Sequence, residues 1–150
     1  MVIQRLQNLY FLIVSALMGL FCFCPFMKVT TTDGVFIAHS TAGAKLYDGE
    51  VVNMIYNWPT LIVTVLAAVL AVVAIFRYSN LKLQRTIAKV DIFMVLISIA
   101  LIIPNMIKDY ATTSFSFALA LPVVAIAFLW LAIKGINHDI KVLSSADRIR

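Results

Sequence analysis

The 150-residue sequence predicts an all-α membrane protein, a four-transmembrane-helix bundle with a small antiparallel β hairpin or sheet in its first external loop. Hydrophobic residues make up 63% of the chain and charged residues 13%, with a mean hydropathy of +1.00. A soluble domain has roughly 45 to 50% apolar residues. The second observation is a series of long, nearly charge-free runs, and the third is an uneven distribution of Lys and Arg between them. At this length we expect a single integral membrane domain.

The first helix is expected at about residues 6–27, a run without charge between Arg5 and Lys28. At about 1.5 Å per residue, this run can cross a hydrocarbon layer of roughly 30 Å. It has neither the shorter apolar core nor the A-x-A-like site of a cleaved signal peptide, so we expect it to stay attached.

The first external connection, residues 28–57, is long enough to fold. It has β-branched runs separated by Asp33-Gly34 and Asp48-Gly49. Asp-Gly between such runs is a hairpin signal. The sequence therefore predicts an antiparallel sheet of two or three strands, because two strands alone are marginally stable. The other external loop, around residues 108–114, is expected to be short.

The second helix is predicted at residues 58–76, beginning at Trp58 or Pro59. Tryptophan suits the membrane interface, and proline suits a first helical turn because its missing N–H is not needed there. A cytoplasmic loop, residues 77–89, follows this helix.

The third apolar run, residues 92–107, is short, so its helix must recruit earlier residues and is expected at about 86–107. This places Asp91 in its first turns. The fourth helix is expected at 115–133, where Pro122 predicts a kink. A cytoplasmic tail, residues 134–150, completes the chain.

Basic residues predict the orientation. One side of the bundle receives nine Lys and Arg and the other receives three. The positive-inside bias therefore places both termini in the cytoplasm. The nine are Arg5, Arg77, Lys82, Arg85, Lys89, Lys134, Lys141, Arg148 and Arg150; the three are Lys28, Lys45 and Lys108.

No motif for catalysis, for a cofactor or for a metal is recognised. The chain lacks a phosphate loop, a G-x-G-x-x-G and an H-E-x-x-H. His39 and His138 are predicted on opposite sides of the membrane, so they cannot share a site. Cys22 and Cys24 are two residues apart on a helix and point in different directions, which favours packing over metal binding. We therefore expect no enzyme, no cofactor and no bound nucleic acid or identified small-molecule substrate.

Asp91 is the one candidate for a buried ionisable group, and such groups in membranes are functional by default. Two readings stay open. The carboxylate can be stabilised by the helix dipole and by Lys89, Arg85 or the tail arginines. Alternatively, it serves a proton or ion relay.

The tail holds the remaining polar residues. Ile136, Ile140 and Leu143 recur at helical spacing, so the fourth helix can continue with one apolar face. Ser144 and Asp147 have the spacing of a capping box, which predicts that the helix stops and restarts there. The tail can serve topology and lipid headgroup contact, or specific docking of a partner.

The chain begins with "QRLQNLY" at residues 4–10 and ends with Asp139 followed by "SADRIR" at 145–150. In these two motifs it resembles the domain of unknown function 4293 (DUF4293) family, small four-helix inner-membrane proteins of the Bacteroidota. The sequence departs from the family pattern at Ile140, where a glutamate is expected, and at Ser144, where a basic residue is expected. The resemblance implies the architecture and the bacterial inner membrane, but no reaction. The matching residues are Gln4, Arg5, Gln7, Leu9, Tyr10, Asp139, Ser145, Asp147, Arg148 and Arg150.

These observations define a set of candidate interaction residues. We expect Asp147 or Asp139 to pair with Arg5 or Arg85 and so to fasten the tail against the bundle. The candidates are Gln4, Arg5, Arg85, Asp91, Asp139, Ser145, Asp147, Arg148 and Arg150.

The leading functional hypothesis is a non-catalytic accessory or assembly subunit that contacts the lipid bilayer and a larger membrane complex or another copy of itself. The alternative is a small oligomeric transporter or channel, in which Asp91 and Asn105 would be the first residues to test.

Overall fold

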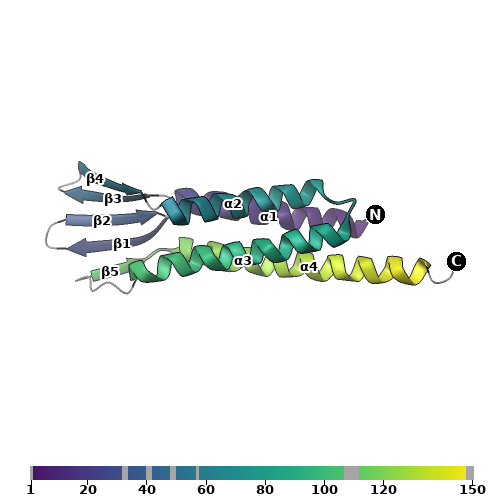
Figure 1. Cartoon of the computed structure of the whole chain (residues 1–150). Helices are drawn as coiled ribbons and strands as arrows, with labels where there is room; N and C mark the ends of the chain where they lie inside the picture. The colour runs from purple at the N-terminus through teal and green to yellow at the C-terminus, as the bar shows by residue number, and fades with distance from the viewer. Residues whose placement is uncertain are drawn as a thin grey trace.

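Four long helices run side by side, and a β-sheet extends from one end of them (Figure 1). The computed structural model describes residues 2–31, 34–39, 42–47, 50–56, 58–106 and 112–147, with side chains for 6–25, 58–103 and 116–145. The helices are α1 (Val2–Phe23), α2 (Trp58–Phe76), α3 (Leu81–Met106) and α4 (Ala120–Asp147). The start of α1 and the end of α4 lie together at what we call the terminal end, opposite the sheet end (Figure 1).

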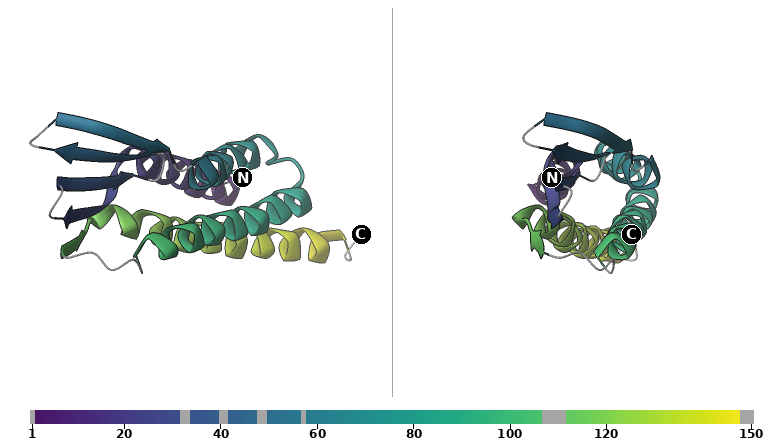
Figure 2. Two further views of the ribbon diagram at one scale, coloured as in Figure 1. Left: turned by 60° about the vertical axis from the view of Figure 1, so that its left-hand side comes forward. Right: turned by 90° about the vertical axis from the view of Figure 1, so that its left-hand side faces the viewer.

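All four helices are long and apolar enough to cross a membrane. The prediction of four membrane-spanning helices is confirmed, and the chain is a multi-pass membrane protein. Seen along the bundle, the helices form a ring in which each packs against two neighbours (Figure 2).

The buried residues of every helix recur at alternating intervals of three and four. Such a seven-residue repeat is the pattern of left-handed helix packing. Bulky side chains of α1 fill the core, whereas α2 contributes only alanines and threonines, which let the backbones approach closely. The fully buried bulky residues of α1 are Phe11, Met18 and Phe21; the buried residues of α2 are Thr60, Thr64, Ala67, Ala71 and Ala74.

Helix α2 begins at Trp58, with Pro59 in its first turn, and ends at a tight turn before α3. Helix α3 starts at Leu81, five residues earlier than the sequence predicts. The reason is Asn80, whose Oδ1 accepts a hydrogen bond of 3.1 Å from the backbone N–H of Leu83. This is an N-cap, which satisfies one of the otherwise unpaired N–H groups of the first turn.

Helix α4 also differs from the prediction. It follows a short 3₁₀ helix, η1 (Phe117–Leu119), and begins at Ala120, so Pro122 lies in its first turn. A proline there removes no needed hydrogen bond. The predicted stop and restart at Ser144 is wrong, because α4 runs without interruption to Asp147 and the Ser144 hydroxyl donates to the Lys141 carbonyl at 2.9 Å.

The sheet at the other end has five antiparallel strands in the order β4-β3-β2-β1-β5. Strand β5 comes from the connection between α3 and α4 and pairs with β1, for example Thr113 with Val29. The sheet therefore ties the two helical hairpins together. The strands are β1 (Pro25–Thr31), β2 (Gly34–His39), β3 (Ala42–Tyr47), β4 (Glu50–Tyr56) and β5 (Thr112–Phe115).

The predicted fold class, all-α with a small hairpin or sheet of two or three strands in the first external loop, is wrong. Five strands belong to the sheet, and one of them lies outside that loop. Two features hid this. The connection between β2 and β3, Ser40-Thr41, has no Asp-Gly signal, and β5 is only four residues long. The predicted turn residues Asp33, Asp48 and Gly49 lie outside the described residues.

Candidate functional site

Helices α1 and α4 are joined at the terminal end by a hydrogen bond between side chains. The Gln7 Nε2 donates to Asp139 Oδ2 at 2.7 Å, and Gln7 is only 2% exposed. The close approach is possible because Gly135 has no side chain. A Cβ at Gly135 would lie 3.3 Å from both Cγ and Nε2 of Gln7. The α4 glycine therefore creates the space in which the amide reaches the carboxylate.

Gln84 of α3 joins three helices at one point. Its Nε2 donates to the Ala74 carbonyl of α2 at 3.0 Å and to Asn8 Oδ1 of α1 at 3.3 Å. The side chain is buried, and its Oε1 has no hydrogen-bond partner among the described residues. A buried amide in this position fixes the register of α1, α2 and α3, because shifting any helix would break one of its bonds.

Arg85, the next residue of α3, contacts α4. Its Nη1 donates to Asn137 Oδ1 at 3.2 Å. With Gln7 and Gln84, it completes a network of side-chain bonds that links all four helices at the terminal end. We call Gln7, Asn8, Gln84, Arg85, Asn137 and Asp139 the polar network.

Of the pairs predicted to fasten the tail, Asp139 with Arg85 is the one whose two side chains are both described. This pair is not found, because Asp139 accepts from Gln7 and Arg85 donates to Asn137. The side chains of Gln4, Arg5 and Asp147 lie outside the described side chains, and Arg148 and Arg150 lie outside the described residues altogether. Ser145 is exposed and donates to the Val142 carbonyl of its own helix at 2.8 Å.

Asp91 does not lie at the start of its helix. It is the eleventh residue of α3 (Leu81–Met106), with no exposed surface. Neither carboxyl oxygen has a hydrogen-bond partner within the described part of the chain. Arg85, one of its expected partners, is bonded to Asn137 instead, and Lys89 is exposed.

Sequence reasoning missed the repeat to which Asp91 belongs. Gln84, Asp91 and Ser98 are spaced seven residues apart and are all buried on one face of α3. Their recurrence every seven residues in an apolar sequence was the available signal. The periodicity of apolar residues does not reveal the buried face of α3, because the lipid-facing side of a membrane helix is as apolar as the side that faces the core. Asn105, near the end of α3, lies outside the described side chains.

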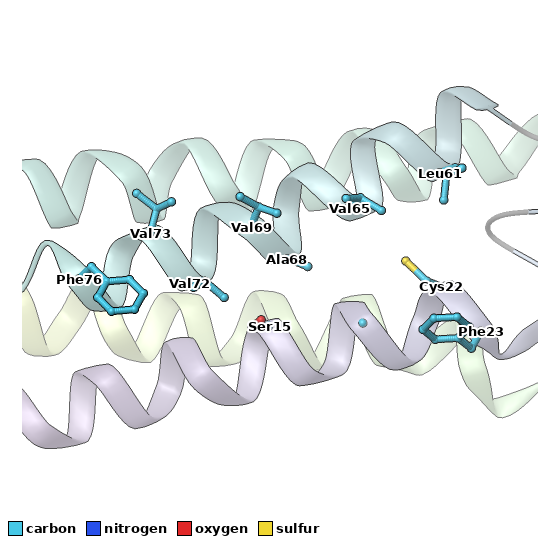
Figure 3. A pocket seen from close by; sticks show the side chains of 11 residues that line it. Ser15, Cys22, Phe23, Leu61, Val65, Ala68, Val69, Val72, Val73 and Phe76 are labelled. Atoms are coloured by element: carbon cyan, nitrogen blue, oxygen red, sulfur yellow. The ribbon is translucent and has the colours of Figure 1, made fainter.

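A groove with a volume of about 530 Å³ runs between α1 and α2 on the outside of the bundle (Figure 3). Its lining is aliphatic and aromatic apart from Ser15 and Cys22. Gly19 also lies here, and a Cβ at that position would meet nothing within 4 Å. This lining is suited to contact with a hydrocarbon chain, and it contains no acidic, basic or other charged side chain. In the described part of the chain, no group of three or more His, Cys, Asp or Glu is arranged to hold a metal ion.

The two glycines provide a matched test of the contact between Gln7 and Asp139. We expect Gly135→Val to lower the free energy of unfolding by about 1–2 kcal/mol, because the new side chain displaces Gln7 and leaves Asp139 without its donor. Gly19→Val adds the same atoms where there is open space and is expected to change stability little. Unfolding by a denaturing detergent in mixed micelles measures both. Equal losses in the two variants would contradict the assignment.

A family model described as "Domain of unknown function (DUF4293)" matches residues 3–149, nearly the whole chain. The search of curated proteins finds no match. The matched range includes every residue of the polar network and Asp91.

Proposed function

From the premise that the chain belongs to the DUF4293 family, whose description assigns no activity, we propose that it is a non-catalytic accessory or assembly subunit of a larger membrane complex. We place it in the bacterial inner membrane with both termini in the cytoplasm. The terminal end would then face the cytoplasm, in keeping with the nine basic residues assigned to that side.

The observation that carries this proposal is the length of α4. The helix has 28 residues, and its last turns extend beyond the turn between α2 and α3 (Figure 1). Two apolar side chains, Val142 and Leu143, are 52% and 56% exposed there. In the proposed orientation these two residues follow the polar positions Lys134, His138 and Lys141 and lie on the cytoplasmic side of the hydrocarbon layer. Apolar surface on a rigid helix in that place is typical of a protein contact site. The neighbouring Lys141 and the following Arg148 and Arg150 favour an acidic partner surface.

The experiment is purification of the tagged full-length chain from its own membranes in a mild detergent, with mass spectrometry of what accompanies it. We expect stoichiometric partners, and we expect Leu143→Glu to remove them by placing a charge in the apolar contact. Ser144→Glu is the control, since it adds the same charge on an adjacent exposed position. Migration of the wild-type protein at the mass of one chain, without cross-linked partners, would disprove the proposal.

The second candidate is a small oligomeric transporter or channel. The observation that favours it is Asp91, a buried carboxyl group without a partner in the described structure. Four helices alone hardly enclose a polar path, so this function requires several copies of the chain. If Asp91→Asn leaves ion and solute flux in proteoliposomes unchanged, the transporter reading loses its support.

A further inference from the structure

Three polar residues lie along the buried face of α3. Gln84, Asp91 and Ser98 are seven residues apart, and each is at most 1% exposed. Since the helices form a ring, this face points toward the interior of the bundle rather than to the lipid (Figure 2). At about 1.5 Å per residue, Asp91 lies about 10 Å along α3 from the level of Gln84, toward the sheet end.

Among the side chains that the structure describes, the helices around Asp91 offer it no compensating charge. Among the described residues, the buried faces of α1, α2 and α4 carry one titratable side chain, Cys22, near the sheet end of α1. Tyr10 of α1 is half-buried and packs against the Phe128 ring. Among the described side chains, the charged and titratable groups of α4 and the remaining ones of α3 lie exposed or in the polar network. They are Lys134, His138, Asp139 and Lys141 of α4, and Lys82, Arg85 and Lys89 of α3.

A carboxylate in these surroundings would be an unpaired charge in a medium of low dielectric constant, which is strongly unfavourable. Both oxygens lack any donor in the described structure. The same carboxyl group carrying a proton has no net charge and can stay buried. The site therefore favours a proton over a metal cation, because in the described part of the chain Asp91 belongs to no group of three or more His, Cys, Asp or Glu that could hold a metal ion.

Buried polar groups lie on both sides of Asp91, but among the described side chains those on the terminal side are the ones that form bonds between helices. Toward the sheet end, the Thr64 hydroxyl of α2 donates to the Thr60 carbonyl of its own helix.

On the terminal side, Gln7 donates to Asp139. Gln84 shares the buried face of α3 with Asp91, and its Oε1 has no hydrogen-bond partner among the described residues. Only Ala88, whose side chain is a methyl group, lies between Gln84 and Asp91 on the buried face. Toward the sheet end, Val95 follows Asp91 on the buried face of α3, and the Ser98 hydroxyl donates to the Val95 carbonyl at 2.7 Å.

We propose that Asp91 is a proton-binding site inside the bundle, loaded and unloaded from the terminal end past Gln84. The proton is held as the carboxyl O–H, and it leaves to water that reaches the polar network. This inference goes beyond the accessory role, because it requires neither a partner complex nor net transport.

The test uses the purified full-length chain in liposomes of a single zwitterionic lipid and dicyclohexylcarbodiimide, an apolar reagent that reacts with protonated carboxyl groups. The carboxyl proton moves to one carbodiimide nitrogen as the carboxylate oxygen adds to the central carbon, and the O-acylisourea rearranges to a stable N-acylurea. Mass spectrometry of peptides locates the adduct. We expect labelling of Asp91 that is lost as the pH on the terminal side is raised, and no adduct on this peptide in Asp91→Asn.

Two controls make the result specific. Asp147→Asn removes a carboxyl group at the last residue of α4, outside the polar network, and is expected to leave the Asp91 adduct in place. Gln84→Leu removes the polar group nearest to Asp91 on the terminal side and is expected to slow the response of labelling to a pH jump. Thr64→Val, a buried change on α2 where the hydroxyl bonds only to its own helix at 2.7 Å, is expected not to slow it.

A second measurement on the unmodified protein guards against poor access of the reagent. The infrared difference spectrum between low and high pH should contain a protonated-carboxyl C=O band that disappears in Asp91→Asn. Absence of both the adduct and the band would overturn the proposal, and so would labelling that follows only the pH on the sheet side. The loss of partners in Leu143→Glu is measured in a separate experiment. A failure to label Asp91 would therefore leave the proposed accessory role intact, and a failure to find partners would leave the proton-binding site intact.

Discussion

Phe11→Ala is expected to destabilise the bundle more than any other single change proposed for this protein. Phe11 is fully buried in α1 and belongs to the core cluster shared by all four helices. Its removal leaves a cavity in a core to which α2 contributes only alanines and threonines, so that helix has little bulk with which to fill it. We expect the free energy of unfolding to fall by about 2–4 kcal/mol, somewhat less than in a water-soluble core because lipid also accommodates the ring in the separated helices.

The measurement is a titration of helix content with sodium dodecyl sulfate in mixed micelles. Phe93→Ala is the matched control, since Phe93 of α3 is 63% exposed and its truncation removes the same atoms from the lipid-facing surface. Its expected effect is below about 0.5 kcal/mol. If Phe93→Ala lowers the free energy of unfolding as much as Phe11→Ala does, the buried residues have been assigned to the wrong face of the helices.

Gln84→Leu is expected to have the second largest effect, about 1–3 kcal/mol, because it takes the side-chain donor from two acceptors. These are Asn8 Oδ1 and the Ala74 carbonyl. The first acceptor is half-buried, and the second is buried and keeps only a 3.3 Å bond from the backbone N–H of Arg77. Since Ala74 lies in the last turn of α2, the adjoining turn should also open more often. Hydrogen exchange of the backbone around residues 74–80 is expected to accelerate in the variant.

Thr86→Val on the same helix is the control for Gln84→Leu. Thr86 is exposed and its hydroxyl donates only to the Lys82 carbonyl of its own helix at 3.1 Å. We expect no change of exchange between residues 74 and 80. Should Gln84→Leu leave both stability and exchange at their wild-type values, the amide would not be the link among α1, α2 and α3.

The helices were predictable where their signals are local. Charge-free runs and the Trp58-Pro59 pair depend on neighbouring residues only, and four apolar helices are found. The start of α3 was missed because Asn80 precedes a stretch rich in basic residues, which resembles a loop. Strand β5 was missed for another reason. Its four residues have little pattern of their own and are strands because β1, far away in the sequence, pairs with them.

In the polar network, too, some residues could be predicted from local sequence, whereas their partners depend on residues far away in the chain. The sequence indicated Asp139 and Arg85 as residues that fasten the terminal end, but not their partners. The bond between Gln7 and Asp139 depends on how closely α1 approaches α4, which Gly135 decides. Opposite charges suggest arginine and aspartate as a pair, yet the amides of Gln7 and Asn137 are the groups that the packing brings within reach.

The short length of α2 limits where this protein can reside. With 19 residues it is about 28 Å long, and a tight turn after it and β4 shortly before it prevent extension at either end. A bilayer thicker than this helix must thin around it, at a cost that grows with each ångström of mismatch. The other three helices can tilt, but α2 must stand nearly upright. Among membranes of different thickness, the protein should therefore concentrate in the thinner ones.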